Sequence, residues 1–283
     1  MTSSSPEIGK TLTVDGVRIN FHDQGQGDAV LLIHGSGPGV TAWANWRTIL
    51  PVLAETHRVI APDMAGFGYT ETPADFDATP AAWVRQVIGL LDALGLQKVT
   101  IIGNSFGGAI ALKTASLHPD RVDRLVLMGS VGTPFPITEG LQKVWGYQPS
   151  HEAMNELLHI FAYDHSIISD DLVDMRYRAS IRADVQDRFA ALFPEPRQAG
   201  VEMLALSDAE LAAIDIPVVA IHGRDDQVIP FSVSEALVRK LPRAELHPID
   251  ACGHWVQIEK APEFLDIVTG FLGAGDDRAA QSA

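Results

Sequence analysis

The sequence predicts an α/β fold with a mostly parallel sheet, helices on both of its faces and an inserted helical lid. Along most of the 283 residues, short β-branched and apolar runs alternate with helical patterns, which is the order of β-α-β units. Between about residues 134 and 213 this alternation stops, and the pattern is helical throughout. We therefore expect the α/β core at 8–133 and 214–273, the lid at 134–213, and flexible tails at 1–7 and 274–283.

The first half of the chain supplies a hairpin and then alternating strands and helices. Asp15-Gly16 is a strong signal for the hairpin turn. Pro51 is expected to end the helix before it, whereas Thr79 and Pro80 predict the N-cap and first turn of the next helix. The expected strands span 11–14, 17–22, 29–33, 58–61, 98–102 and 124–128, and the expected helices span 43–50, 80–94 and 109–115.

The second half begins with the lid and then returns to strands. An all-helical block inserted into an α/β chain is typical of a lid over a site. After the lid, strands are expected at 218–221 and 245–248, each followed by a helix. The expected helices of this half span 137–145, 150–162, 170–192, 201–213, 231–241 and 262–271.

Composition restricts the possible partners. The chain is 46% hydrophobic and 20% charged, which is ordinary for a globular domain, and its formal net charge is −15 at pH 7. It has no basic stripe for nucleic acid, and an anionic ligand would need a local cation. A single cysteine, Cys252, fits a reducing compartment, the first residues lack a signal pattern, and no apolar run is long enough to span a membrane. We expect a cytoplasmic protein without nucleic-acid or membrane partners.

Ser105 lies in the stretch Gly103-Asn104-Ser105-Phe106-Gly107-Gly108, between a buried strand and a helix of small residues. A serine between glycines at a strand-to-helix turn is the nucleophile-elbow pattern. The alternative is a glycine-rich turn without chemistry, because so short a pattern also occurs by chance. The choice depends on whether an acid and a histidine follow later strands.

Both residues are present after the two strands that follow the lid. Asp226 follows the first of these strands and His254 the second, in the order Ser…Asp…His of the α/β-hydrolase fold. Loops at the carboxyl ends of parallel strands converge, so His254 could accept the proton of Ser105 while Asp226 fixes the imidazole tautomer. Asp226 is preferred to Asp225 because it directly precedes the apolar turn into the next helix; Asp225 stays open as the alternative.

Other polar residues are expected to be structural. Asp63, after the strand at 58–61, is expected to accept hydrogen bonds from amides of a tight loop. Cys252 has no thiol-activating neighbours and is expected to pack. The other histidines show no ligand spacing, so we expect no metal and no cofactor. The loop His34–Gly39 is rich in glycine and must approach a ligand or the elbow closely.

Over nearly its whole length, the chain resembles the meta-cleavage product hydrolases, which are carbon–carbon bond hydrolases of bacterial aromatic degradation. The motifs that carry this resemblance are HGSGPG at 34–39, WANW at 43–46, GNSFGG at 103–108 and CGHW at 252–255. Two further motifs, ITEGL at 137–141 and FPEPRQ at 193–198, are similar to the 2-hydroxymuconate semialdehyde and alkyl-catechol branch. The resemblance implies a cofactor-free homo-oligomer that hydrolyses 2-hydroxy-6-oxo-dienoates to 2-hydroxypenta-2,4-dienoate and a small acid.

The resemblance also implies roles for individual residues. Asp226 would be the triad acid, and the backbone amides of Ser36 and Phe106 would form the oxyanion hole. The residues implied to bind substrate are Asn45, Asn104 and Arg197 at the carboxylate and 2-oxygen, Trp255 along the chain, and Val131, Leu141, Trp145 and Ile229 around the C6 substituent. Without the resemblance, Arg197 would be interpreted as an exposed lid charge. Valine at 131, where this branch often has a smaller residue, favours small C6 substituents over phenyl.

Two other functions stay open at this point. A carboxylesterase could use the same residues, and turnover of short nitrophenyl esters in place of a dienoate would indicate it. A noncatalytic receptor on the same fold would bind a small molecule tightly without turnover. The intact set of Ser105, Asp226 and His254 weighs against the receptor.

Overall fold

An eight-stranded sheet forms the centre of the computed structural model, which describes residues 5–183 and 185–273. The strand order is β1-β2-β4-β3-β5-β6-β7-β8, with β1 and β2 antiparallel at one edge and parallel pairing from β4 to β8. The predicted mostly parallel α/β fold is confirmed. The strands are β1 Lys10–Val14, β2 Val17–Gln24, β3 Ala29–Ile33, β4 Arg58–Pro62, β5 Val99–Asn104, β6 Val122–Met128, β7 Val218–Gly223 and β8 Ala244–Ile249.

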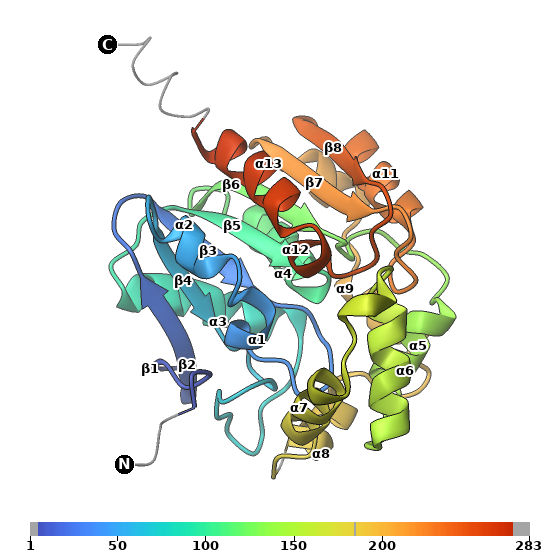
Figure 1. Ribbon diagram of the computed structural model, residues 1–283. Helices are drawn as coiled ribbons and strands as arrows, with labels where there is room; N and C mark the ends of the chain where they lie inside the picture. The colour runs from blue at the N-terminus through green and yellow to red at the C-terminus, as the bar shows by residue number, and fades with distance from the viewer. Residues whose placement is uncertain (1–4, 184, 274–283) are drawn as a thin grey trace, which may run out of the picture.

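Two hydrophobic cores cover the two faces of the sheet, because successive side chains of a strand point to opposite sides. In β3, Leu31 and Ile33 belong to one core, and Val30 and Leu32 belong to the other. The helices around the sheet are α1 Ala42–Trp46, α2 Leu50–Leu53, α3 Pro80–Ala93, α4 Phe106–Leu117, α11 Phe231–Lys240, α12 Val256–Glu259 and α13 Ala261–Gly273. Figure 1 shows α1, α2, α12 and α13 in front of the sheet.

The segment between β6 and β7 is helical and lies together at one side of the molecule (Figure 1). We call residues 134–213 the helical insertion. Its elements are α5 Glu139–Trp145, α6 His151–Phe161, the 3₁₀ helix η1 His165–Ile167, α7 Asp170–Ser180, α8 Val185–Leu192, α9 Gln198–Leu204 and α10 Asp208–Ala212. The carbonyl of Phe161, at the end of α6, accepts a 2.7 Å hydrogen bond from the amide of His254. The insertion is therefore bound to the loop that follows β8.

Three of the expected helices are wrong in extent. The helix expected at 43–50 is two helices, and Pro51 lies in the first turn of α2, where a missing N–H costs nothing. The helix expected at 201–213 divides at Ser207, whose side chain and that of Glu210 form a capping box that begins α10. The helix expected at 170–192 divides after Ser180, whose hydroxyl bonds the carbonyl of Tyr177 at 2.8 Å.

The first described residues make polar contacts with the α/β core. Glu7 is expected in a flexible tail, but its carboxylate accepts hydrogen bonds from the hydroxyls of Thr41 (3.1 Å) and Tyr69 (3.2 Å). Residues 1–4 and 274–283, the rest of the expected tails at either end, lie outside the described residues. Within the described part of the chain, none of the helices has the length and apolar character to cross a membrane.

Candidate active site

Ser105 occupies a strained turn between β5 and α4. Its φ of 54° lies in the left-handed region that glycine favours, and such strain is typical of functional positions. The turn also needs glycine on both sides. A Cβ at Gly103 would lie 2.4 Å from the carbonyl oxygen of Gly107, and a Cβ at Gly107 would lie 2.2 Å from that of Ile33. The strand–serine–helix turn that the sequence predicts is present, with the serine at the start of α4.

Asp226 and His254 form a buried pair. Nδ1 of His254 lies 2.7 Å from Oδ2 of Asp226, and the aspartate side chain is fully buried. Oδ1 accepts hydrogen bonds from the amides of Val228 (2.7 Å) and Ile229 (2.9 Å). Nδ1 of His254 therefore carries a proton toward the carboxylate, and Nε2 is the ring nitrogen that can exchange a proton with a reacting group. Asp225, the alternative acid, is exposed.

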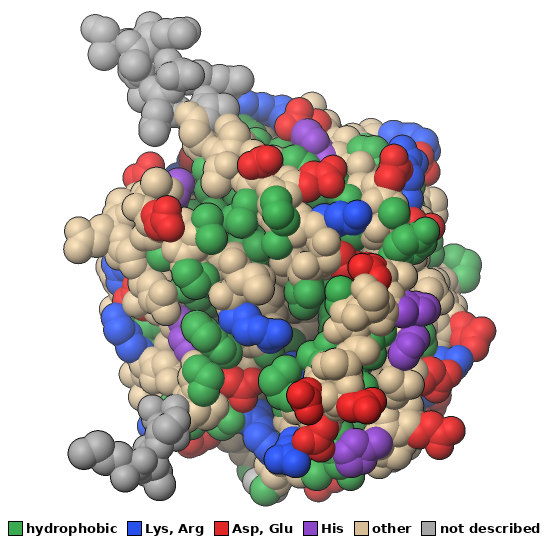
Figure 2. All heavy atoms as spheres, in the orientation of Figure 1, with side chains coloured by type: hydrophobic (Ala, Val, Ile, Leu, Met, Phe, Trp, Pro, Cys, Tyr) green, Lys and Arg blue, Asp and Glu red, His purple; other side chains and the backbone are tan. Residues whose placement is uncertain are grey.

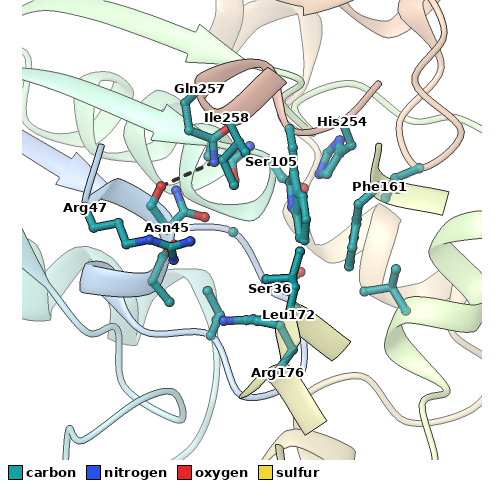
Figure 3. Close-up of a pocket in the computed structure, with 18 of the residues that line it drawn as sticks. Ser36, Asn45, Arg47, Ser105, Phe161, Leu172, Arg176, His254, Gln257 and Ile258 are labelled. Carbon is teal, nitrogen blue, oxygen red and sulfur yellow. Dashed lines mark hydrogen bonds between the residues drawn. The ribbon is translucent and has the colours of Figure 1, made fainter. Parts of the chain in front are cut away.

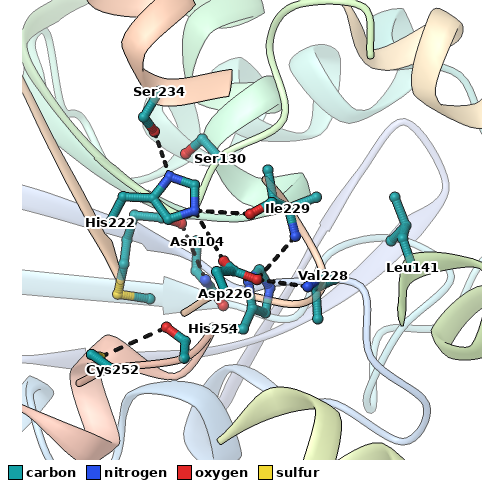
Figure 4. A network of polar contacts seen from close by, with 12 residues as sticks. Asn104, Ser130, Leu141, His222, Asp226, Val228, Ile229, Ser234, Cys252 and His254 are labelled. Atoms are coloured by element: carbon teal, nitrogen blue, oxygen red, sulfur yellow. Dashed lines mark hydrogen bonds and ion pairs between the residues drawn. The ribbon is translucent and has the colours of Figure 1, made fainter. Parts of the chain in front are cut away.

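A second histidine shares the carboxylate of Asp226 (Figure 4). Nε2 of His222 lies 3.1 Å from Oδ2 of Asp226 and 3.0 Å from the carbonyl oxygen of Ile229. Both neighbours are acceptors, so Nε2 must carry the proton, and Nδ1 faces the hydroxyl of Ser234 at 2.7 Å. The sequence alone predicts no role for His222. Its position at the end of β7, four residues before Asp226, was the available signal.

The electrostatics keep Asp226 ionised. Burial opposes ionisation, but the positive charge of His254 and the hydrogen bonds from both histidines outweigh it and hold the pKa of Asp226 below its ordinary range. Cys252 differs, because burial, with Glu259 nearby, raises the pKa of its thiol to about 12. A thiol with so high a pKa is not a nucleophile at neutral pH.

The loop after β3 is held by His34 and by the helical insertion. Nδ1 of His34 lies 2.6 Å from the carbonyl oxygen of Gly35, and its Nε2 accepts from the amide of Met64 at 2.9 Å. Burial lowers the pKa of His34 to about 4, so the ring is neutral. Nε1 of Trp145, on α5, donates to Oγ of Ser36 at 2.9 Å. Phe106 begins α4, where the first amides have no acceptor within the helix.

A cavity of about 260 Å³ lies over Ser105. Figure 3 shows Arg47 and Asn45 on one side of it and His254 and Phe161 on the other, with Ser105 between. The sequence-predicted residues that line this cavity are Ser36, Asn45, Asn104, Ser105, Leu141, His254 and Trp255. Nδ2 of Asn45 is buried without a hydrogen-bond partner among the described residues. A ligand acceptor could satisfy it.

Arg197 is not in this cavity, which corrects the expectation from the resemblance. Its guanidinium pairs with Glu195, and its Cζ lies beside Gly146. Arg176, on α7, lines the cavity instead. The structure records no ion pair between Arg176 and a described carboxylate. Burial, together with the charges of Arg47 and Arg182, lowers the pKa of Arg176 to about 10, against an opposing effect of Glu7, so the side chain stays cationic at neutral pH.

Arg176 was not among the residues predicted to bind substrate, although its spacing in the sequence indicates that it lies on an apolar helix face. Arg176 follows Leu172 by four residues, so both side chains lie on one face of the helix, and both line the cavity. An arginine on the apolar side of a lid helix needs a reason to be there.

Three other expected lining residues are buried but do not line the cavity: Val131, Trp145 and Ile229. Trp145 instead stacks on Phe193, with ring centroids 4.1 Å apart, and Ile229 packs in the core. Val228, the neighbour of Ile229, lines the cavity together with Leu141 and Phe161. The apolar wall near His254 therefore has partly different members from those expected.

Asp63 has the structural role that the sequence predicts. Its oxygens accept from the amides of Ala42 (2.6 Å) and Tyr69 (2.8 Å) and from the side chain of Asn20 (2.8 Å). Burial raises the pKa of Asp63 to about 6 in spite of these bonds. The residue holds the loop after β4 and does not line the cavity over Ser105.

The sheet order, the turn at Ser105 and the buried Asp226–His254 pair define an α/β hydrolase. Residues 28–261 match the α/β hydrolase fold family. A 2-hydroxymuconate semialdehyde hydrolase of Pseudomonas sp. (strain CF600) is 52% identical over 276 residues, 98% of each chain. A 2-hydroxy-6-oxo-2,4-heptadienoate hydrolase of Pseudomonas putida (strain F1) is 49% identical over 98% of this chain and 100% of that one.

A solved structure gives the same result. It is a serine-to-alanine variant of a meta-cleavage product hydrolase from Pseudomonas fluorescens IP01, complexed with acetates. It is 49% identical, with a TM-score of 0.95 over 96% of this chain and 100% of that one. The chain belongs to the meta-cleavage product hydrolases of the α/β-hydrolase fold.

Proposed function

We propose that the protein hydrolyses the C5–C6 bond of 2-hydroxymuconate semialdehyde and its small 6-alkyl analogues, with Ser105, His254 and Asp226 as a catalytic triad. The observation that carries this proposal is the polarity of one cavity. Ser105 and His254 line it together with two arginines, Arg47 and Arg176, which form no ion pair with the described residues. A substrate with a carboxylate at one end and a carbonyl at the other would fit this cavity. The carboxylate would face the two arginines, and the carbonyl would face Ser105 and His254.

The substrate's carboxylate would bind Arg176 and Arg47. A guanidinium offers paired donors that match a carboxylate, and burial strengthens such a pair. Nδ2 of Asn45, which has no partner among the described residues, would donate to the 2-oxygen. Asn104 lines the same cavity, and Trp255 would pack along the chain of the diene. This arrangement leaves C6 near Ser105.

Cleavage needs a place for the electron pair of the C5–C6 bond. The 2-hydroxy-dienoate first takes a proton at C5 and gives up its 2-hydroxyl proton, which produces the 2-oxo form. Addition of oxygen at C6 and fission of the C5–C6 bond then send the pair through C4 and C3 onto the 2-oxygen. The cations at that end stabilise the developing enolate, and they do so most in the transition state.

The triad supplies the nucleophile and moves the protons. Nε2 of His254 would take the proton of Ser105, or of a water that Ser105 holds, as the oxygen adds to C6. Asp226 keeps Nδ1 protonated and supports the charge that the ring gains. The amides of Ser36 and Phe106 would stabilise the C6 oxyanion, an effect of about 3–4 kcal/mol in comparable sites. If Ser105 adds, one water then hydrolyses the resulting ester and releases the small acid; if water adds, the small acid leaves directly when the C5–C6 bond breaks.

The C6 substituent would meet an apolar wall that includes Leu141, Phe161 and Val228. A bulky substituent would overpack this wall, and overpacking an apolar wall costs about 1–3 kcal/mol. We expect kcat/KM for hydrogen, methyl and isopropyl substituents to exceed that for phenyl by about tenfold or more.

The test is the loss of dienolate absorbance for these four substrates. A preference for phenyl would contradict the proposed substrate class. Hydrolysis of short nitrophenyl esters without any loss of dienolate absorbance would indicate a carboxylesterase in its place.

A cytoplasmic location and a homo-oligomeric state remain part of the proposal. The single cysteine supports the first. Size-exclusion chromatography with light scattering measures the second directly.

A further inference from the structure

A second cavity adjoins the one over Ser105, and the two share a wall. This outer cavity has a volume of about 500 Å³. Ala44, Arg47 and Arg176 line both cavities, so the outer one begins where the carboxylate end of the inner one ends. Figure 2 shows this face of the molecule, with a hollow near its centre and a Lys or Arg side chain beside the hollow.

Four arginines line the outer cavity: Arg47, Arg176, Arg178 and Arg182. Arg178 pairs with Asp174 at 2.9 Å. Arg182 stacks on the ring of Tyr69, 3.8 Å from its centroid, and donates to the carbonyl of Gly68 at 3.1 Å. Among the described residues, no carboxylate forms an ion pair with Arg47, Arg176 or Arg182.

One acid, Glu7, also lines the outer cavity, and its two oxygens already accept from hydroxyls. The cavity therefore carries more positive than negative side chains, in a chain whose formal net charge is −15. Like charges repel when they lie close together and partly desolvated, so clustered arginines cost free energy unless an anion compensates them.

We propose that the outer cavity is an anion-binding vestibule through which the carboxylate of the dienoate reaches Arg176. The inference rests on the proposed function for the identity of the anion. The net charge of the chain repels an anionic substrate at long range, and salt screens that repulsion beyond about 8–10 Å. A local group of arginines attracts the carboxylate within this distance and guides it to the shared wall. Arg176 then binds the carboxylate, which stays within the positively charged region throughout.

The test is the second-order rate constant for association, measured by stopped flow over a range of NaCl concentrations. Arg178→Gln removes one charge of the vestibule without touching the inner cavity. Arg239→Gln is its matched control, because Arg239 also pairs with an acid four residues earlier on an exposed helix, Glu235 on α11. The association rate constants are measured for 2-hydroxymuconate semialdehyde and for hexa-2,4-dienoate, a carboxylate that the enzyme cannot cleave.

At low salt, Arg178→Gln should lower the association rate constant about threefold, and the double variant Arg178→Gln/Arg182→Gln should lower it about tenfold. In both variants kcat should stay within twofold of the wild type. Arg182→Lys should keep most of the rate, because it keeps the charge. Added NaCl should erase the differences between these variants and the wild type, while Arg239→Gln should match the wild type throughout.

If the association rate constants of Arg178→Gln, Arg239→Gln and the wild type are equal, the proposed vestibule is wrong, even if the dienoate is hydrolysed normally. If the semialdehyde is not hydrolysed but hexa-2,4-dienoate shows the charge dependence, the proposed function fails and the anion site stands.

Discussion

The two oxygens of Asp226 have different partners, and this separation defines what the residue does. Two backbone amides, of Val228 and Ile229, hold Oδ1 in place. Oδ2 faces two imidazoles, at 2.7 Å for His254 and 3.1 Å for His222. The carboxylate is therefore fixed by one oxygen and acts through the other. His222 bonds Asp226 but does not line the cavity over Ser105, so we expect it to be a positioning residue.

Replacing His222 should weaken catalysis without weakening binding. His222→Phe removes a donor to Asp226, and a hydrogen bond to a charged group contributes about 1.5–3 kcal/mol. We expect kcat to fall about tenfold or more with KM nearly unchanged, and His222→Gln, which keeps an N–H donor, to recover part of the loss. Steady-state kinetics measures this. An equal rise in KM would indicate general disruption of the site.

Variants of Arg176 and Arg197 show which of the two arginines binds the carboxylate of the substrate. Arg176→Gln should lower kcat/KM about 10- to 100-fold, with part of the loss in kcat, because its contact strengthens as the enolate forms. Arg176→Lys should recover only part, since a point charge lacks the planar fork. Arg197→Gln should stay within about twofold of the wild type, because Arg197 pairs with Glu195 and does not line the cavity over Ser105. The reverse order would return Arg197 to the role that the resemblance implies.

At the scale of elements, the loops after β3, β5, β7 and β8 carry the residues of the proposed catalytic site, and buried polar side chains fix those loops. His34 follows β3 and joins it to the loop after β4 through the amide of Met64. The helical insertion contributes Arg176, the Trp145 bond to Ser36, and the Phe161 carbonyl that holds His254. One part of the chain thus carries Ser105, the proposed nucleophile, and the other encloses it.

The buried neutral His34 should make stability depend on pH. Burial lowers its folded pKa from 6.5 to about 4, so between these values the unfolded chain binds more protons and stability falls as the pH falls. From pH 7 to pH 5 this removes about 2 kcal/mol. In His34→Gln, the difference in unfolding free energy between pH 7 and pH 5, from urea denaturation, should be smaller by this amount. An unchanged difference would contradict the role of His34.

Local signals predicted most elements and failed where two elements meet. The hairpin turn at Asp15-Gly16 has positive φ at both residues, as such turns require. Helical periodicity joined α9 to α10, because it does not register the capping box at Ser207. A similar limit explains why Arg197 was expected in the cavity. A short motif indicates which residues a family shares, but the direction of a side chain depends on the helix that carries it. Sequence spacing puts Arg176 on the same face of its helix as Leu172, but only the fold places that face over the cavity with Ser105.

At the scale of the whole molecule, charge and topology act together. The parallel strands bring Ser105, Asp226 and His254 to one edge of the sheet, although they lie far apart in sequence. The chain order of these residues after successive strands made the fold and the three positions predictable. The net charge of −15 predicted that an anionic ligand needs a local cation, and the arginines of the two cavities supply such cations.

Release of formate from 2-hydroxymuconate semialdehyde by the wild type and by Ser105→Ala tests the central claim most directly. The wild type should release one formate for each dienolate lost. Ser105→Ala should fold normally and still bind the substrate, and it should release formate at least about a thousandfold more slowly. Formate release by Ser105→Ala at near the wild-type rate, or its absence with the wild type, would contradict the account.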